Sequence, residues 1–394
     1  MHSVRSTRTF WLLASLGGAL AAVGVGAAHV MESKGHVITG MGNEVVWGLP
    51  HVFAIFMIVA ASGVLNMASV GSVFGQPVYK ARARLSGLLS LALLAGGLMV
   101  LMLDLGRPDR VIVAATHYNF RSVFAWNVFL YSGMAAIVVV YLWTMLEPAL
   151  GRWSKAAGIA ALVWRFVLTT GTGSIFGFLV ARQAYQSAVL APLFILLSLA
   201  WGLAVFLLVQ AVVYAASGRN WTPEVRERIA RLLAIFVGAS LYLVAVQHMT
   251  NLYETRRGAF EAFLLLGQGG GAAYALLFWV GYVLLGSMLP LVLLFHPRLR
   301  GDGCVIAASA LVVLGAFAWL FAFIIGGQAF PLDIFPGHTV SSTFGDGVVA
   351  SYGPSLPELL LGVGGVGAAF LITVVGMRLF DMLPADPAPL PQKV

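Results

Sequence analysis

Cysteine is almost absent from this chain, since Cys304 is the single one among 394 residues. One thiol cannot build a disulfide framework, ligate an iron–sulfur cluster or attach a c-type haem within the chain. Histidine is also scarce, and no apolar run carries two histidines about two turns apart. A bis-histidine haem b site needs such pairs at matching depth. We therefore expect no haem, iron–sulfur cluster or other metal site in this chain, so any such centre belongs to a partner.

Charge is scarce as well: charged residues make up 10% of the chain, against 60% hydrophobic residues and a mean hydropathy of +0.92. Soluble domains do not have this composition. Apolar runs long enough to cross a bilayer as helices recur along the whole length, and the short alternating segments of a β-barrel are missing. The sequence predicts an all-α polytopic membrane protein with about ten transmembrane helices, arranged as two four-helix bundles plus two extra helices.

These spans form one integral membrane domain over residues 1–394, followed by a Pro-rich tail at 383–394 that we expect to be disordered. The first apolar run resembles a signal peptide, but it is long enough to span, so we expect it to be retained. The predicted spans lie near residues 10–30, 48–70, 86–104, 122–146, 158–181, 190–216, 230–250, 271–295, 304–325 and 357–380.

Lysine and arginine are distributed unequally between the two sides of the predicted bundle. Of the 23 basic residues, fifteen fall in connections on one side, seven on the other, and Arg165 lies inside a span. Basic residues concentrate on the cytoplasmic side of membrane proteins, so both termini are predicted to be cytoplasmic. The net charge of +8 is explained in this way and does not indicate nucleic acid. Arg165 is close enough to the cytoplasmic side for its side chain to reach the interface.

Polar residues gather at the outward ends of the first four predicted spans. If these spans form one bundle, the polar groups converge near its outer mouth. Such residues suit quinone chemistry, because oxidising a quinol releases two protons that a histidine or carboxylate must accept, and an aromatic ring can stack on the quinone. A structural interpretation, in which each histidine bonds water or a carbonyl at the interface, stays open. The candidates for proton transfer are Asp104, His51 and His29, and those for quinone binding are Trp47, His51, Asp104, Arg107 and Asn127.

A second outward cluster closes the seventh predicted span and contains His248, Tyr253 and Glu254. It could line a second polar pocket or form a docking surface for an extrinsic subunit. The docking interpretation is favoured, because further charges follow in the loop.

Several stretches of the chain resemble the NrfD/PsrC family of quinone-interacting membrane subunits. They include Thr-Gly-Met-Gly-Asn at 39–43, Val-Trp-Gly-Leu at 46–49, Leu-Asp-Leu-Gly-Arg-Pro at 103–108 and Tyr-Gly-Pro-Ser-Leu-Pro-Glu at 352–358. The ten spans are similar to the longer, HybB-like branch. The likeness is greatest to the DsrP-type subunit of the Dsr transmembrane complex, notably over Gly-Leu-Pro-His-Val-Phe-Ala-Ile-Phe at 48–56.

The resemblance implies a subunit of a redox complex in a prokaryotic cytoplasmic membrane, in respiration or sulfur metabolism. Such a subunit exchanges electrons between an exchangeable quinone, menaquinone or ubiquinone, and a ferredoxin-like iron–sulfur subunit on the outer face. Further partners implied by the Dsr likeness are a multihaem cytochrome c, a haem b membrane subunit and a cytoplasmic iron–sulfur subunit.

Two other functions remain open from the residues alone. A secondary transporter or proton channel needs a polar site near the membrane midplane, often between broken helices. A structural membrane anchor for redox partners needs no ligand site of its own.

Overall fold

The fold is an assembly of long helices, identified from a computed structural model that describes residues 7–73, 75–218, 221–296, 301–332, 347–380 and 382. In these ranges every regular element is helical, and ten helices are long and apolar enough to cross a membrane. The predicted fold class is thereby confirmed. The tail predicted at 383–394 lies outside the described residues.

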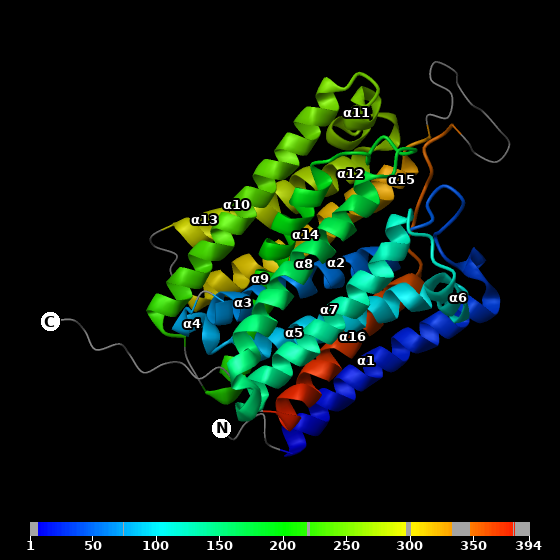
Figure 1. Ribbon diagram of the computed structural model, residues 1–394. Coiled ribbons are helices and arrows are strands. Elements are labelled where there is room, and N and C mark those ends of the chain that lie inside the picture. The colour runs from blue at the N-terminus through cyan, green and yellow to red at the C-terminus, as the bar shows by residue number, and fades with distance from the viewer. Residues whose placement is uncertain are drawn as a thin grey trace.

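Figure 1 shows the long helices lying roughly side by side, with the start of α1 (Thr7–Lys34) and the end of α16 (Leu356–Leu379) near one end. We call this end, where the first helix begins and the last one ends, the terminal end, and the other the cavity end. The α-helices are α1 (Thr7–Lys34), α2 (Leu49–Val64), α3 (Asn66–Val73), α4 (Pro77–Lys80), α5 (Ala83–Leu103), α6 (Val111–Thr116), α7 (Val123–Leu146), α8 (Ser154–Gly177), α9 (Leu190–Ser217), α10 (Pro223–Tyr253), α11 (Gly258–Leu266), α12 (Ala272–Leu276), α13 (Leu289–Phe295), α14 (Asp302–Leu320), α15 (Gly327–Ala329) and α16 (Leu356–Leu379).

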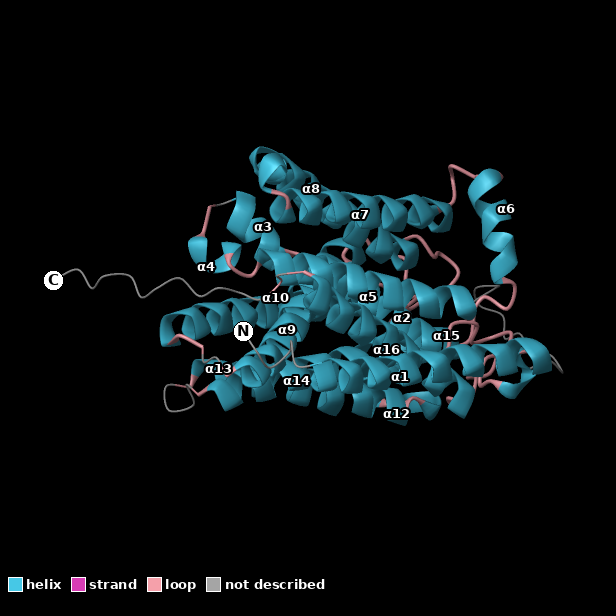
Figure 2. Cartoon of the chain, turned by 90° about the horizontal axis from the view of Figure 1, so that it is seen from below, coloured by secondary structure: helices cyan, strands magenta, loops and turns pink. Residues whose placement is uncertain are grey.

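Two four-helix bundles form the body of the protein. In the first bundle α2 with its continuation α3 packs against α5, α5 against α7, α7 against α8, and α8 against α3. In the second bundle α9, α10, α14 and the span formed by α12 and α13 pack together. The helices α2 and α8 contact α9, which joins the bundles. In Figure 2 α7 and α8 lie together along one side, and α6 stands across the helix ends.

The first helix does not belong to the first bundle, so the arrangement considered from the sequence, with the first four spans in one bundle, was wrong. Instead, α1 packs along α16, and α16 packs against α5. Gly24 and Gly364 face each other so closely that a Cβ on either would meet the other's backbone. Small residues allow this close approach of membrane helices. The first bundle therefore consists of the second to fifth spans.

The second span is interrupted at Leu65, between α2 and α3. Side chains of the neighbouring α5 satisfy backbone groups around the break. The Ser86 hydroxyl donates to the Val64 carbonyl at 2.7 Å and accepts from the Ala68 amide at 3.2 Å. In lipid, an interrupted helix needs such partners, because unsatisfied backbone groups are costly away from water.

Candidate functional site

A cavity of about 380 Å³ lies in the first bundle at its cavity end. Its walls are mostly apolar side chains from α2, α5, α7 and α8, and the polar exceptions are His51, Asn127, Tyr131 and Ser132. Leu105 and Phe124 line it while remaining half exposed, so the cavity opens between the end of α5 and the start of α7. A lateral, largely apolar opening suits a hydrophobic ligand that arrives through the bilayer.

A histidine–carboxylate pair lies at one wall of this cavity, with His51 lining the cavity and Asp104 behind it. His51 Nδ1, in the first turn of α2, lies 2.8 Å from Oδ2 of Asp104, the residue that caps the end of α5. Both side chains are mostly buried, at 16% and 2% exposure. The other Asp104 oxygen, Oδ1, is buried without a hydrogen-bond partner among the described residues. With Nδ1 directed at the carboxylate, the second ring nitrogen of His51 remains for a ligand, and the carboxylate can stabilise an imidazolium.

Aromatic rings surround this pair. The Trp47 ring lies over the His51 ring with centroids 5.8 Å apart and planes inclined by 21°. Phe124 and Phe176 pack against the other sides of Trp47 at 5.9 and 5.7 Å. All four residues line the cavity. A flat aromatic ligand could therefore lie against Trp47 while a polar substituent reaches His51.

Asn127 supplies an acceptor on another wall. Its amide nitrogen donates to the Val123 carbonyl at 2.8 Å, whereas the amide oxygen is buried with no partner in the described part of the protein. An unsatisfied buried acceptor is costly, so this oxygen is suited to a ligand hydroxyl or a water molecule. Tyr131 lies one turn further along α7 and also lines the cavity.

The backbone of Trp47 is fixed by Gln328 of α15. The Gln328 side-chain oxygen accepts from the amides of Val46 and Trp47 at 3.0 and 2.9 Å, and its amide nitrogen donates to the Trp47 carbonyl at 3.0 Å. Arg182 donates to the Glu44 carbonyl at 2.7 Å and also bonds the Gln328 carbonyl. Burial lowers the pKa of Arg182. A side chain 281 residues away therefore positions the cavity tryptophan.

The start of α2 is fixed by the Tyr352–Glu358 pair. Tyr352 donates its hydroxyl to Glu358 at 2.6 Å and accepts from the Leu49 amide at 2.6 Å. The buried Glu358 also accepts from the amides of Gly40 and Ser355 at 2.9 and 2.7 Å. At Gly48 a Cβ would collide with both the Tyr352 hydroxyl and Glu358, so only glycine fits there. Burial, and then the carboxylate, raise the pKa of Tyr352 above its ordinary value.

The predicted site residues separate into two groups in space. Trp47, His51 and Asn127 line the cavity, and Asp104 supports it through His51. Two other candidates lie elsewhere. His29 is exposed on α1, outside the first bundle. Arg107 is exposed and bonds Asp109 at 3.2 Å, a hydrogen bond that raises the pKa of the guanidinium and lowers that of the carboxyl.

The second predicted cluster divides in a similar way. His248 Nδ1 lies 2.8 Å from Oε2 of the fully buried Glu261, which also accepts from Asn251 at 2.7 Å. By contrast, Tyr253 is 92% exposed, and Glu254 pairs with Arg257 at 2.7 Å. The histidine therefore belongs to a buried network, while Tyr253 faces outward. Both proposed roles, a pocket and a docking surface, stay predictions.

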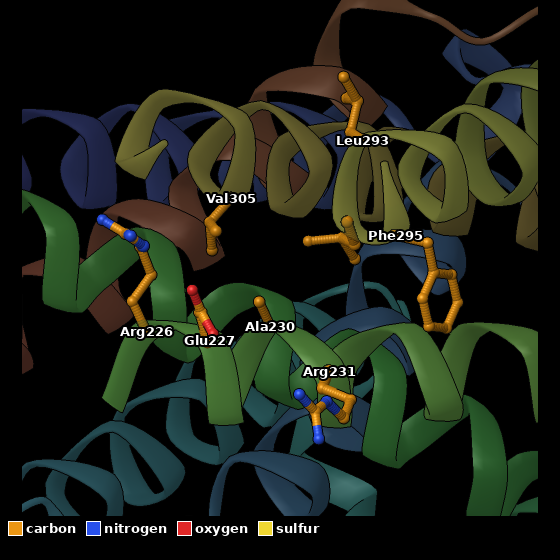
Figure 3. Close-up of a pocket in the computed structure, with 8 residues that line it drawn as sticks. Arg226, Glu227, Ala230, Arg231, Leu293, Phe295 and Val305 are labelled. Atoms are coloured by element: carbon orange, nitrogen blue, oxygen red, sulfur yellow. The ribbon is translucent and has the colours of Figure 1, made fainter. Parts of the chain in front are cut away.

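A smaller cavity of about 130 Å³ lies at the terminal end, between α10 on one side and α13 and α14 on the other (Figure 3). Arg226 and Arg231 stand on one side of it, and the apolar side chains of Leu293 and Phe295 on the other. Arg226 pairs with Asp302 at 2.8 Å. None of the predicted site residues lines this cavity.

Neither Gln328 nor Glu358 was identified as supporting the site from the sequence. The signal available for Glu358 was an acidic residue opening an apolar span, three positions after Ser355, which is the pattern of a capping box. The structure contains that capping box. For Gln328, a lone amide in a glycine-rich stretch, no local signal pointed to Trp47.

The fold and the cavity define an integral membrane protein of helical bundles with a mostly apolar cavity at one end. The family model described as polysulphide reductase, NrfD, matches residues 37–332, which is well over half of the sequence. The chain therefore belongs to the NrfD family.

Several relatives match most of the sequence. An Hdr-like menaquinol oxidoreductase integral membrane subunit of Archaeoglobus fulgidus is 28% identical, with 91% of this chain and 90% of the relative covered. A putative dimethyl sulfoxide reductase membrane subunit of Halobacterium salinarum is also 28% identical, covering 93% and 90%. A polysulfide reductase chain of Wolinella succinogenes is 26% identical, covering 73% and 96%. The relatives are thus named as membrane subunits or chains of oxidoreductases.

Proposed function

We propose that this chain is the quinone-reactive membrane subunit of a redox complex, and that the cavity of the first bundle holds the quinone head group. It would exchange electrons between the quinone pool and an extrinsic iron–sulfur subunit. The observation that carries the proposal is His51, paired with the buried Asp104, in the wall of a mostly apolar cavity that opens between α5 and α7. Quinone is then an exchangeable substrate that enters from the bilayer.

The proposed chemistry follows from the geometry of this pair. A quinol hydroxyl placed at the free ring nitrogen of His51 can transfer its proton there, and the Asp104 carboxylate stabilises the resulting imidazolium. The Asn127 amide oxygen, which has no partner among the described residues, can accept from the second hydroxyl. Trp47 stacks on the ring, and the apolar wall receives the isoprenoid tail.

The excess of basic residues at the terminal end supports placing that end in the cytoplasm and the cavity near the outer face. The extrinsic partner would then dock at the cavity end. The resemblance to the DsrP-type subunit suggests an iron–sulfur protein there, with a multihaem cytochrome c, a haem b membrane subunit and a cytoplasmic iron–sulfur subunit in the same complex. The name of the Archaeoglobus relative makes menaquinone the first quinone to test.

The test measures menaquinol-linked electron transfer and quinone-analogue binding in the purified complex. His51→Gln should abolish turnover while the complex still assembles, because glutamine cannot take up the proton. Normal turnover in His51→Gln and Asp104→Asn would instead mean that the protein is an anchor without its own quinone site. Solute flux through the chain alone in liposomes, without quinone dependence, would support a transporter.

A further inference from the structure

An open cavity of about 390 Å³ lies at the terminal end, between α4 and the start of α10. Figure 1 shows α4 at this end of the protein. We call this cavity the α4–α10 groove. It shares no lining residue with the cavity of the first bundle, so a ligand there would be independent of the candidate quinone site. The lining residues are Tyr79 of α4 and Glu224, Glu227, Arg228, Arg231, Leu232 and Ile235 of α10.

The lining of this groove changes from charged to apolar along α10. Arg231, Leu232 and Ile235 lie three, four and seven positions after Arg228, so all four residues share one face of the helix. Ile235 lies about 10 Å further from the terminal end than Arg228, because each residue of a helix advances by about 1.5 Å. The two arginines and Ile235 are exposed. A ligand that fits this face is anionic at one end and apolar at the other.

The apolar part of this face continues as an open surface toward the middle of α10. Gly238 follows Ile235 by three residues, and a Cβ built on it would meet nothing within 4 Å. Tyr242 follows one turn later on the same face and is 66% exposed. An extended hydrocarbon chain therefore has room to lie along α10, beside Ile235 and Gly238.

Tyr79 supplies a buried hydrogen-bond donor at the charged end of the groove. The residue is 6% exposed, yet its hydroxyl has no hydrogen-bond partner among the described residues. Burial raises the pKa of this hydroxyl, and the nearby charges of Arg228 and Arg82 only partly oppose the rise. The hydroxyl is therefore protonated at neutral pH. A buried donor that the protein itself leaves unpaired is suited to an oxygen atom of a ligand.

The groove holds two arginines and two glutamates, so their pairing decides which charge is left for a ligand. Glu224 lies in the first turn of α10, where a carboxylate stabilises the positive end of the helix dipole. Glu227 also lines the smaller cavity and is engaged in an interaction of its own. Neither Arg228 nor Arg231 pairs with a carboxylate among the described residues. Two guanidinium groups are therefore available to an anion.

The smaller cavity on the other side of α10 is less suited to an anion. Its Arg226 is already paired with Asp302 at 2.8 Å. Arg231 lines both cavities, and Figure 3 shows its side chain directed away from Leu293 and Phe295 of the smaller one. The unpaired positive charge therefore belongs to the α4–α10 groove.

We propose that the α4–α10 groove binds an anionic phospholipid of the surrounding bilayer. Its phosphodiester would accept hydrogen bonds from the Tyr79 hydroxyl and from the guanidinium groups of Arg228 and Arg231, and an acyl chain would lie along Ile235 and Gly238. Arginine is well suited to phosphate, and basic pockets between transmembrane helices bind anionic head groups. A zwitterionic lipid fits less well, because it brings a cation close to two unpaired guanidinium groups. The proposal does not depend on the function proposed for the first-bundle cavity.

A lipid in this groove would link the two bundles at the terminal end. Tyr79 belongs to α4, which connects α3 and α5 of the first bundle, whereas Arg228 and Arg231 belong to α10 of the second bundle. One phosphate bonded to all three side chains therefore holds both bundles. A ligand that binds only the folded protein raises its stability, so the bound lipid should raise the thermal midpoint of unfolding.

The experiment uses the whole purified complex, delipidated in a neutral detergent and titrated separately with phosphatidylglycerol, phosphatidylcholine and inorganic phosphate. Thermal unfolding reports stabilisation, and native mass spectrometry reports bound lipid. We expect phosphatidylglycerol alone to raise the thermal midpoint and to remain bound. In Arg228→Gln/Arg231→Gln, half of that rise should need at least about tenfold more phosphatidylglycerol, because each basic residue near the membrane surface attracts anionic lipid. Tyr79→Phe should show a smaller loss in the same direction, since it removes only one neutral donor.

Arg152→Gln/Lys155→Gln is the matched control. It also removes two exposed basic residues spaced three apart, in the connection between α7 and α8 and the first turn of α8, and neither lines the groove. This variant should respond to phosphatidylglycerol as the wild type does. Equal weakening in both double variants would show unspecific attraction to a basic surface and overturn the site. A wild-type response to phosphatidylcholine as strong as that to phosphatidylglycerol, or an equal response to inorganic phosphate, would overturn an anionic lipid as the ligand.

Discussion

His51 and Asp104 are 53 residues apart in the sequence, yet Nδ1 of His51 lies 2.8 Å from Oδ2 of Asp104. Asp104 caps the end of α5, and His51 lies in the first turn of α2. The carboxylate fixes the imidazole at the cavity wall and leaves its second nitrogen for a ligand. Neither residue could accept a proton from a ligand in this way alone. Without Asp104 the imidazole of His51 would not be held in one orientation, and without His51 the carboxylate of Asp104, which lies behind the cavity wall, would not reach the ligand.

Replacing Asp104 by asparagine tests the pair most directly. Asp104→Asn keeps the size but removes the negative charge that stabilises a protonated His51. We expect menaquinol-linked turnover to fall by about 100-fold or more, the usual effect of losing a general base system. Quinone-analogue affinity should change little, because Asp104 does not line the cavity.

Asp109→Asn is the matched control for Asp104→Asn. Asp109 lies five residues further along the sequence, and its side chain is exposed and bonds Arg107. Its removal should leave turnover near the wild-type rate. Equal losses in both variants would show that the outer loop, and not the buried pair, limits the reaction.

Trp47→Ala should weaken quinone binding without abolishing the chemistry. An aromatic contact contributes about 0.5–1.5 kcal/mol beyond burial, so we expect the Kd of a quinone analogue to rise about tenfold by fluorescence titration. Trp47→Phe should recover most of the affinity. Trp143→Ala removes a 60% exposed tryptophan of α7 and serves as the control. If the two alanine variants bind equally well, the ring does not stack on Trp47.

The span count could be predicted from the sequence, because length and hydropathy of a transmembrane helix are local properties. Which helices pack against each other could not be predicted from the sequence. The pairing of α1 with α16 depends on Gly24 meeting Gly364, and no local pattern records which of many glycines face each other. Arg165 is a second example. Its position within the predicted span was close enough to the span end for its side chain to reach the membrane interface, but the packing of the helices buries it.

The candidate site was partly predictable for a similar reason. Trp47, His51, Asp104 and Asn127 were selected because they sit at ends of spans on one predicted side, and the structure places them together. His29 met the same criterion, but α1 lies outside the bundle. Supporting residues such as Gln328 act on Trp47 across 281 positions, a relationship that appears only after folding.

Gln328→Leu should loosen the segment that carries Trp47. Two amides and one carbonyl would lose their side-chain partner, and each unsatisfied buried group costs about 1–3 kcal/mol. We expect a lower thermal midpoint and weaker quinone-analogue binding, both followed by tryptophan fluorescence. Gln268→Leu is the control, because Gln268 is exposed at the same end of the protein. An unchanged midpoint in Gln328→Leu would mean that the segment is held by its other contacts.

Tyr352 gives the protein a pH-dependent contribution to stability. Its folded-state pKa is raised, so the protonated hydroxyl is favoured in the fold, and the contribution is complete below the ordinary pKa of 10.0. It is lost as the pH rises from there through the folded pKa. Tyr352→Phe should therefore be less stable than the wild type at pH 8, and the difference should shrink above pH 10 in denaturation measured across the pH range. Tyr253→Phe, at a 92% exposed position, controls for loss of a hydroxyl. A difference that stays constant, or grows, above pH 10 would contradict the hydrogen bond from Tyr352 to Glu358 as its source.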